Sequence, residues 1–281
     1  MKKIIALCAF TLLLTACSST DTPADSSLSA TSNENSSTVG SVPESGAKQN
    51  FSDDMKIPYT VDLHEYGADS VERMGDHQNS PYFTSPDFYN MESTGSLALL
   101  PQFKTQQQTS EWSCGLSAVL MVLEYYGMTG DHNEETLAQM RHNAMNEEAT
   151  LLVDIIKIFE TLGFTVDSTF DHGDEVYDYM TLDKIRENVE NGLPMVIGWN
   201  DWGGHWQVII GYDTMGTEDY YGDDVIIVAD SYDTTDHNQD GYGIYPAERF
   251  WYNFTMYDFL EENFEDCEER DFLFALPMLA E

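Results

Sequence analysis

Positively charged residues are scarce in this chain. Among its 281 residues, Lys and Arg number 12 against 50 Asp and Glu, which leaves a formal net charge of −38. Nucleic-acid binding needs clustered cations that neutralise phosphates, and attraction to anionic lipid needs them as well. The charge balance therefore excludes a nucleic-acid partner, and it argues against attachment to a membrane through a basic surface.

Cysteine and cofactor motifs are equally scarce. The four Cys residues, at positions 8, 17, 114 and 267, are too far apart for a metal knuckle or a redox C-x-x-C pair. The sequence contains no phosphate loop, dinucleotide fingerprint, zinc ligand set or internal repeat, so we expect no required cofactor. The chain is nevertheless 42% hydrophobic and 12% aromatic, which excludes a disordered or collagenous protein.

Only one long apolar run is present, and it lies at the start of the chain. Two lysines precede the apolar residues 4–14, which match the length of a signal-peptide core and are too short to span a bilayer. The letters L-T-A-C that end at Cys17 resemble a bacterial lipobox, in which the Cys is acylated and becomes the new N-terminus. We predict a lipoprotein signal peptide over residues 1–16 and lipidation of Cys17; the alternative is an ordinary secretory signal.

Composition divides the remainder into three parts. Residues 18–50 contain fourteen Ser or Thr and no aromatic residue, so we predict that 17–50 form a lipidated, disordered tether. Residues 51–100 lack a sustained period and are treated as an N-terminal arm, and 101–281 as the catalytic domain. We expect a monomer in the cell envelope, facing outside the cytoplasm and attached to the membrane through lipid only.

Apolar periodicity and capping residues predict helices first and a cluster of strands later. The predicted helices cover 113–126, a segment that begins at Asn133, 150–163 and 181–191. The predicted strands cover 164–170, 195–199, 205–212 and 225–231. This order favours an α+β fold over alternating βαβ units.

Cys114 is the first candidate for chemistry. It lies just inside a predicted helix N-terminus capped by Ser113, where backbone N–H groups and the helix dipole favour the nucleophilic thiolate. Gly115 would leave space for a substrate backbone. A lone Cys at such a position is more often a buried apolar residue.

Three further residues favour a catalytic role for Cys114. Gln108 precedes it by six residues, and its amide could donate to an oxyanion together with the Cys114 N–H. His205 opens a predicted strand after two glycines and could act as the general base. Asp230 ends the next strand and could orient the His205 ring. Each of these residues alone would be structural; their combination indicates nucleophilic catalysis.

The segments around these residues resemble the papain-like cysteine peptidases, above all the bacteriocin-processing, double-glycine-leader peptidases and their free-standing relatives. The segments are Q-T-S-E-W-S-C-G-L-S-A-V-L-M-V-L-E-Y-Y-G, G-H-W-Q-V-I-I-G-Y-D and V-I-I-V-A-D-S-Y-D, within about residues 100–255. The resemblance implies a papain-like α+β fold in which a helical part with the nucleophile packs on an antiparallel sheet with His and Asp. It also implies Cys114 as nucleophile, His205 as base, Asp230 as orienting group and Gln108 as oxyanion donor.

The predicted function is that of an exported, lipid-anchored cysteine peptidase that cleaves a peptide or amide bond. Its substrate would be a peptide or protein, with cell-wall peptide as one candidate. If an amine replaces water, the same residues would make an acyltransferase or transglutaminase. A disulfide between Cys114 and Cys267 is the structural alternative to catalysis.

An acidic loop follows Asp230. Asp236, Asn238 and Asp240, with Gly241 next, match the opening of a calcium-binding loop, in which alternate oxygens surround one cation. Position twelve of the motif is Ala247, so the loop departs from an EF-hand. It could hold a structural calcium ion or be a hydrophilic turn. The rival functional class is therefore a catalytically inactive, calcium-dependent binding lipoprotein.

Overall fold

The computed structural model describes residues 53–58, 61, 63, 66–68, 80–217, 219–255 and 273–280. These residues belong to one unit, Lys48–Glu281. The predicted signal peptide, the lipidated Cys17 with its tether, and Cys267 lie outside the described residues. Among the helices that are described, none is long and apolar enough to cross a membrane.

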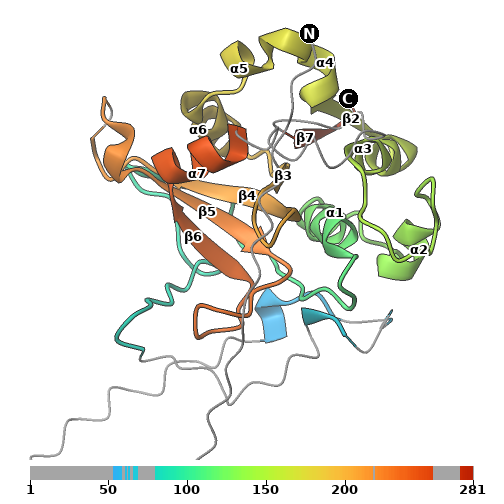
Figure 1. Cartoon of the computed structure of the whole chain (residues 1–281). Helices are drawn as coiled ribbons and strands as arrows, with labels where there is room; N and C mark the ends of the chain where they lie inside the picture. The colour runs from blue at the N-terminus through green and yellow to red at the C-terminus, as the bar shows by residue number, and fades with distance from the viewer. Residues whose placement is uncertain are drawn as a thin grey trace, which may run out of the picture. The chain divides into compact units, whose positions relative to one another are not determined.

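One antiparallel sheet organises the described part of the chain (Figure 1). Its neighbouring strands follow the order β2-β7-β3-β4-β5-β6, and β1 pairs with β4. The strands are β1 (Leu97–Leu99), β2 (Phe164–Ser168), β3 (Met195–Trp199), β4 (His205–Asp213), β5 (Val225–Asp230), β6 (Tyr242–Pro246) and β7 (Leu273–Leu279). Almost every residue of β3, β4 and β5 is buried, which is expected where helices cover both faces of a sheet.

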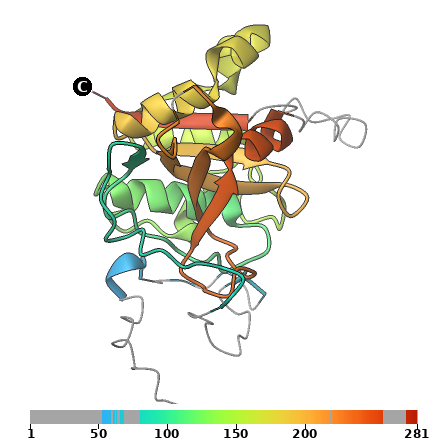
Figure 2. The same cartoon turned by 90° about the vertical axis from the view of Figure 1, so that its left-hand side faces the viewer.

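Helices pack on both faces of this sheet. Helix α1 lies on one face, and α6 and α7 lie on the other (Figure 2). The α-helices are α1 (Cys114–Tyr125), α2 (Glu134–Ala138), α3 (Leu152–Thr161), α4 (Thr169–His172), α5 (Val176–Tyr179), α6 (Leu182–Glu190) and α7 (Ala247–Thr255). Short 3₁₀ turns cover Asp53–Met55, Gly173–Glu175 and Tyr221–Asp223. The structure confirms the predicted α+β class.

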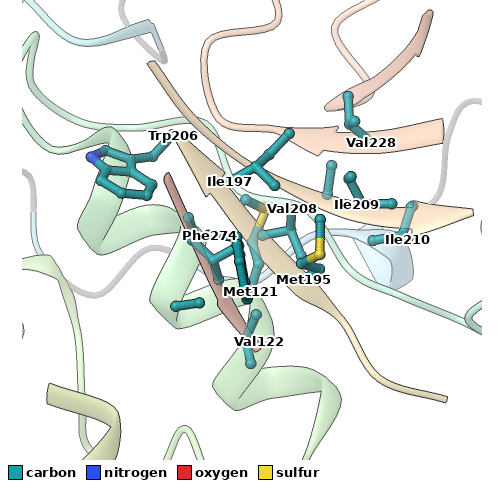
Figure 3. Packing of buried hydrophobic residues seen from close by; sticks show 14 of the residues in the cluster. Met121, Val122, Met195, Ile197, Trp206, Val208, Ile209, Ile210, Val228 and Phe274 are labelled. Atoms are coloured by element: carbon teal, nitrogen blue, oxygen red, sulfur yellow. The ribbon is translucent and has the colours of Figure 1, made fainter. Parts of the chain in front are cut away.

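The core is formed where α1 meets the central strands. Figure 3 shows Met121 and Val122 of α1 near Ile197 of β3, Val208 of β4 and Phe274 of β7. These five side chains are fully buried. Because α1 is buried from Cys114 to Leu123, the position and orientation of its first residue are fixed by packing along the whole helix.

Most of the predicted elements between residues 113 and 231 are present. Asn133 caps α2 by accepting a hydrogen bond from the Thr136 N–H, and Thr181 caps α6. Most of their ends agree within one residue, and two elements differ by more. Helix α3 covers Leu152–Thr161 instead of 150–163. The strand predicted over 164–170 ends at Ser168, because the side chain of Asp171 accepts from the Ser168 N–H and starts a new helical turn.

Part of the N-terminal arm is built into this fold. Strand β1 pairs with the C-terminal end of β4, and the backbone of Lys56 forms an isolated parallel β-bridge with Thr105. Met55, Ile57 and Phe88 are buried in the core. The described apolar residues of the arm are therefore part of the same core as the domain.

Candidate active site

His205 and Asp230 lie side by side on neighbouring strands. His205 opens β4 after a turn in which Gly203 and Gly204 adopt φ angles of +82° and +127°, values that L residues rarely adopt. Asp230 ends β5, and the His205 Nε2 lies 2.7 Å from the Asp230 Oδ1. The Tyr232 N–H donates to the same oxygen at 2.7 Å. The antiparallel pairing of β4 with β5 thus brings the two predicted partners into direct contact.

Cys114 is the first residue of α1, and within the described residues it is a free, buried cysteine. Its thiol lies close enough to the His205 ring to raise the pKa of that ring. Because Nε2 is bound to Asp230, Nδ1 is the ring nitrogen left for another partner. The structure therefore brings Cys114, His205 and Asp230 together.

Burial and charge oppose each other in this chain. Burial lowers the pKa of His205. The Asp230 carboxylate and Cys114 raise that pKa by more than burial lowers it, to about 10. Burial raises the pKa of Asp230, but the charge and hydrogen bond of His205 lower it below its ordinary value. Each partner therefore favours the charged form of the other, so the protonated His205 ring is stabilised beside Cys114.

Gln108 joins the segment before α1 to the segment after Asp230. Its backbone N–H donates to the Ser231 carbonyl at 2.8 Å, and its Oε1 accepts from the Ser231 hydroxyl at 2.9 Å. Its Nε2 donates to the Ser110 carbonyl at 2.7 Å, which leaves the second hydrogen of that amide for another acceptor. The role as oxyanion donor stays a prediction.

Glu134, the first residue of α2, is a buried residue that the sequence reading missed. Its carboxylate accepts from the Thr109 N–H at 3.2 Å, from the Thr109 hydroxyl, and from the hydroxyls of Ser113 at 2.9 Å and Ser117 at 2.5 Å. Burial raises its pKa. The Ser113 hydroxyl does not cap α1 as predicted, since it donates to Glu134 instead. Glu134 thus fixes both sides of Cys114.

We expect Glu134→Ala to destabilise the protein and to impair the site. The substitution leaves the buried donors of Thr109, Ser113 and Ser117 without their acceptor. Each buried donor left unsatisfied costs about 1–3 kcal/mol. A total loss of about 3 kcal/mol in the free energy of unfolding should be visible in urea titrations. Glu135→Ala is the matched control, because Glu135 is exposed on the same helix turn and should change stability little. Equal stability of both variants would contradict this role of Glu134.

Arg141 holds the segment 144–150 in place. Its guanidinium is buried and donates to the carbonyls of Ala144, Asn146 and Glu148. It also lies 4.6 Å from the centre of the Trp112 ring. This segment ends at Thr150, whose side chain would lie 2.8 Å from a Cβ atom at Gly115. The space at Gly115 is therefore taken up by Thr150 and the Trp206 ring, and the expected room for a substrate backbone is not there.

A cavity of about 460 Å³ borders Asp230. Its lining includes Phe83, Asp201, Trp202, Tyr232 and Tyr245. Trp202 is 56% exposed and lies 5.2 Å, centre to centre, from the Tyr232 ring. Trp199 and Trp206 are buried. The tryptophans thus divide between the core and the wall of this cavity.

The three residues of the predicted calcium loop lie together. The Asp236 Oδ1 accepts from the Asn238 N–H at 3.0 Å, and the Asn238 Nδ2 donates to the Asp240 Oδ2 at 2.6 Å. Burial raises the pKa of Asp240 to about 7. Within the part of the chain that the structure describes, no three His, Cys, Asp or Glu side chains are grouped as metal ligands. Calcium binding stays a prediction.

Comparison with known proteins identifies the family. The model of the Peptidase_C39 like family matches residues 100–258, more than half of the chain. The chain belongs to this C39-like family. It is therefore a papain-like cysteine peptidase. The matched segment contains Cys114, His205 and Asp230. No match was found among curated proteins.

Two solved structures are similar to this C39-like chain. One is a double-glycine motif protease from an AMS/PCAT transporter in complex with the leader peptide, at 19% identity and a TM-score of 0.39, covering 58% of this chain and 91% of that one. The other is the peptidase domain of Streptococcus ComA, a bifunctional ABC transporter of a quorum-sensing pathway. It has 15% identity and a TM-score of 0.39, covering 63% and 99% of the two chains.

Proposed function

We propose that this protein is an exported, lipid-anchored cysteine peptidase in which Cys114, His205 and Asp230 form the catalytic triad. The observation that carries the proposal is the buried, hydrogen-bonded pair of His205 and Asp230 beside the Cys114 thiol. The three groups are supplied by three elements, α1, β4 and β5, and an arrangement of this kind is what nucleophilic catalysis by a thiol requires.

The reaction begins with the Cys114 thiolate beside the protonated His205 ring. The sulfur attacks the carbonyl carbon of the scissile amide and forms a tetrahedral intermediate. His205 Nδ1 then gives its proton to the leaving amine, and the acyl group remains on Cys114 as a thioester. A water molecule, activated by the now neutral His205, attacks the thioester and releases the acid. Asp230 holds the ring through Nε2 in every step.

The oxyanion of the intermediate would be bound at the start of α1. As the first helical residue, Cys114 has a backbone N–H without an intrahelical acceptor. The second hydrogen of the Gln108 Nε2 would be the other donor. Two such donors in a site that excludes water stabilise the developing charge strongly.

The substrate is a peptide or protein outside the cytoplasm, with cell-wall peptide as one candidate. The test is digestion of a mixture of peptides of diverse sequence with the purified full-length protein, followed by mass spectrometry. New peptide termini are expected. A parallel reaction with a labelled amine distinguishes hydrolysis from acyl transfer, because only a transferase would attach the label. Absence of cleavage and of label, with an ordinary reactivity of Cys114, would favour the inactive binding protein.

The lipid anchor is tested by Cys17→Ser. If Cys17 is acylated, this substitution should move the protein expressed in a bacterial host from the membrane fraction to the soluble fraction, since the proposed attachment to the bilayer is the lipid on this residue. Cys8→Ser is the matched control: Cys8 lies within the predicted signal and its loss should leave the protein in the membrane fraction. Unchanged fractionation of Cys17→Ser would contradict lipidation at this residue.

A further inference from the structure

A buried glutamine contacts the triad carboxylate from the side opposite His205. Gln207 lies two residues after His205 on β4, and its register partner on β5 is Asp230. Its side chain is 0% exposed. The Gln207 Nε2 donates to the Asp230 Oδ2 at 2.8 Å, while His205 and the Tyr232 N–H use Oδ1. Both oxygens of the carboxylate are therefore engaged, Oδ1 by His205 and the Tyr232 N–H and Oδ2 by Gln207.

Trp199 determines which way round the Gln207 amide lies. The Trp199 Nε1 is 2.7 Å from the Gln207 Oε1, and an indole N–H can only donate. The oxygen of the amide must therefore face Trp199, and its NH₂ must face Asp230. The indole itself is held by ring contacts, at 4.9 Å to Tyr245 and 4.8 Å to Phe250.

A second carboxylate reinforces this orientation. The Gln207 Nε2 also lies 3.2 Å from the Asp201 Oδ2 and 3.2 Å from the Tyr245 hydroxyl, which donates to Asp201 at 3.1 Å. A reversed amide would place its oxygen against two carboxylates and its NH₂ against the indole N–H. Such a reversal would lose every hydrogen bond of the group in a buried environment, where unpaired polar atoms are costly.

We propose that Gln207, oriented by Trp199, is a positioning residue that holds the Asp230 carboxylate in the plane needed to orient His205. This inference rests on the proposed function of the triad and goes beyond it. Gln207 is too deeply buried to touch a substrate, so it acts only through Asp230. Partners of this kind fix the orientation of the groups that do the chemistry.

The physical consequence concerns both geometry and charge. Without the Gln207 donor, the Asp230 carboxylate loses a hydrogen bond to its charged form and can rotate away from the ring. The pKa of Asp230 would then rise, and the weakened carboxylate would raise the pKa of His205 less than it now does. The pH range in which thiolate and imidazolium coexist would become narrower from both sides.

The test compares Gln207→Met, which keeps the length of the side chain and removes every hydrogen bond of the amide, with the wild-type full-length protein. The rate of alkylation of Cys114 by iodoacetamide is followed from pH 4 to pH 10 by peptide mass spectrometry. We expect the acid limb of this profile to move to higher pH, while the rates near pH 10, where the thiolate forms without the imidazolium, stay similar. On a cleaved peptide, kcat should fall about 10–100-fold, as for other outer partners of active-site groups, with KM unchanged. Asn188→Leu, a buried amide on α6, is the matched control and should leave both readouts unchanged.

Trp199→Phe tests the orientation of the amide and keeps the test valid if Gln207→Met does not fold. The phenyl ring preserves the ring contacts but has no N–H, so the amide is free to turn. We expect a smaller shift of the acid limb than for Gln207→Met. If Trp199 acts through Gln207, the double variant should match Gln207→Met alone, because the two changes interrupt one path.

The outcomes separate this inference from the proposed function. If wild-type Cys114 reacts as an ordinary thiol, the proposed function fails and this inference fails with it. If the wild type shows a thiolate at acidic pH and the folded Gln207→Met variant shows the same profile and the same kcat, only the inference about Gln207 is overturned. Effects of Trp199→Phe and Gln207→Met that add would overturn the role of Trp199 as the residue that orients the amide.

Discussion

Replacing Cys114 by Ala is expected to abolish peptide cleavage. The thioester cannot form without the sulfur, and loss of a nucleophile that works as part of a triad typically costs about 10⁴-fold or more in kcat. His205 and Asp230 would still be paired, but they would have no thiol to activate. The measurement is the digestion of the peptide mixture by wild type and variant at equal concentration, with new termini counted by mass spectrometry.

The fold should survive this change. Cys114 contributes one sulfur atom to a helix whose buried residues extend to Leu123, so the melting temperature should change by only a few degrees. Cys114→Ser is a second control: it preserves the shape and a hydrogen-bond donor, yet it should be inactive, since an alcohol is far less acidic than a thiol. Cleavage retained by Cys114→Ala would remove Cys114 from the mechanism.

The sequence predicted that Cys114, His205 and Asp230 come together because the signals at each of these residues are local. A Cys at a helix start, a His after a Gly-Gly turn and an Asp at a strand end can each be read within about ten residues. The antiparallel order of β3, β4 and β5 then brings His205 and Asp230 together through two successive hairpin-like connections. The family model covers the same segments, which agrees with the resemblance to the C39-like peptidases.

The pairing of strands that lie far apart in the sequence could not be predicted from such local signals. Strand β7 pairs with β2 and β3, whose paired residues lie 75 to 115 positions earlier, and β1 belongs to the arm. Nothing near these segments in the sequence announces their partners. Pairing of this kind is decided by burial of the complete sheet, which single-sequence periodicity does not report.

Buried polar residues were missed for a related reason. Glu134 resembles an ordinary acidic residue at a helix start, and Gln207 resembles a polar interruption of an apolar strand. Their partners are Ser113 on another helix and Asp230 on another strand. The available signal was the chemical one: a strongly polar side chain within a buried run must find a hydrogen-bond partner, and near a triad that partner is a candidate positioning contact.

Replacing His205 by Ala is expected to turn Cys114 into an ordinary thiol. A free thiol has a pKa of about 8.5, so at pH 6 well under one hundredth of it is thiolate. In the wild type the pKa of His205 is raised to about 10, and the protonated ring stabilises the thiolate through the whole range below that value. Wild-type Cys114 should therefore be alkylated rapidly at pH 6, at roughly a hundred times the rate of the variant.

The way the ratio of the two alkylation rates changes with pH distinguishes an ion pair between Cys114 and His205 from a mere difference in the exposure of Cys114. As pH rises through the raised pKa of His205, the ring loses its proton and the advantage of the wild type disappears, so the two proteins should react at similar rates near pH 10. His172→Ala is the matched control, because His172 also pairs with a carboxylate, Asp167 at 2.6 Å, but on α4. Its profile should follow the wild type. A constant ratio of the alkylation rates of wild type and His205→Ala from pH 5 to pH 10 would mean that His205 affects only the access of the reagent to Cys114 and does not stabilise the thiolate.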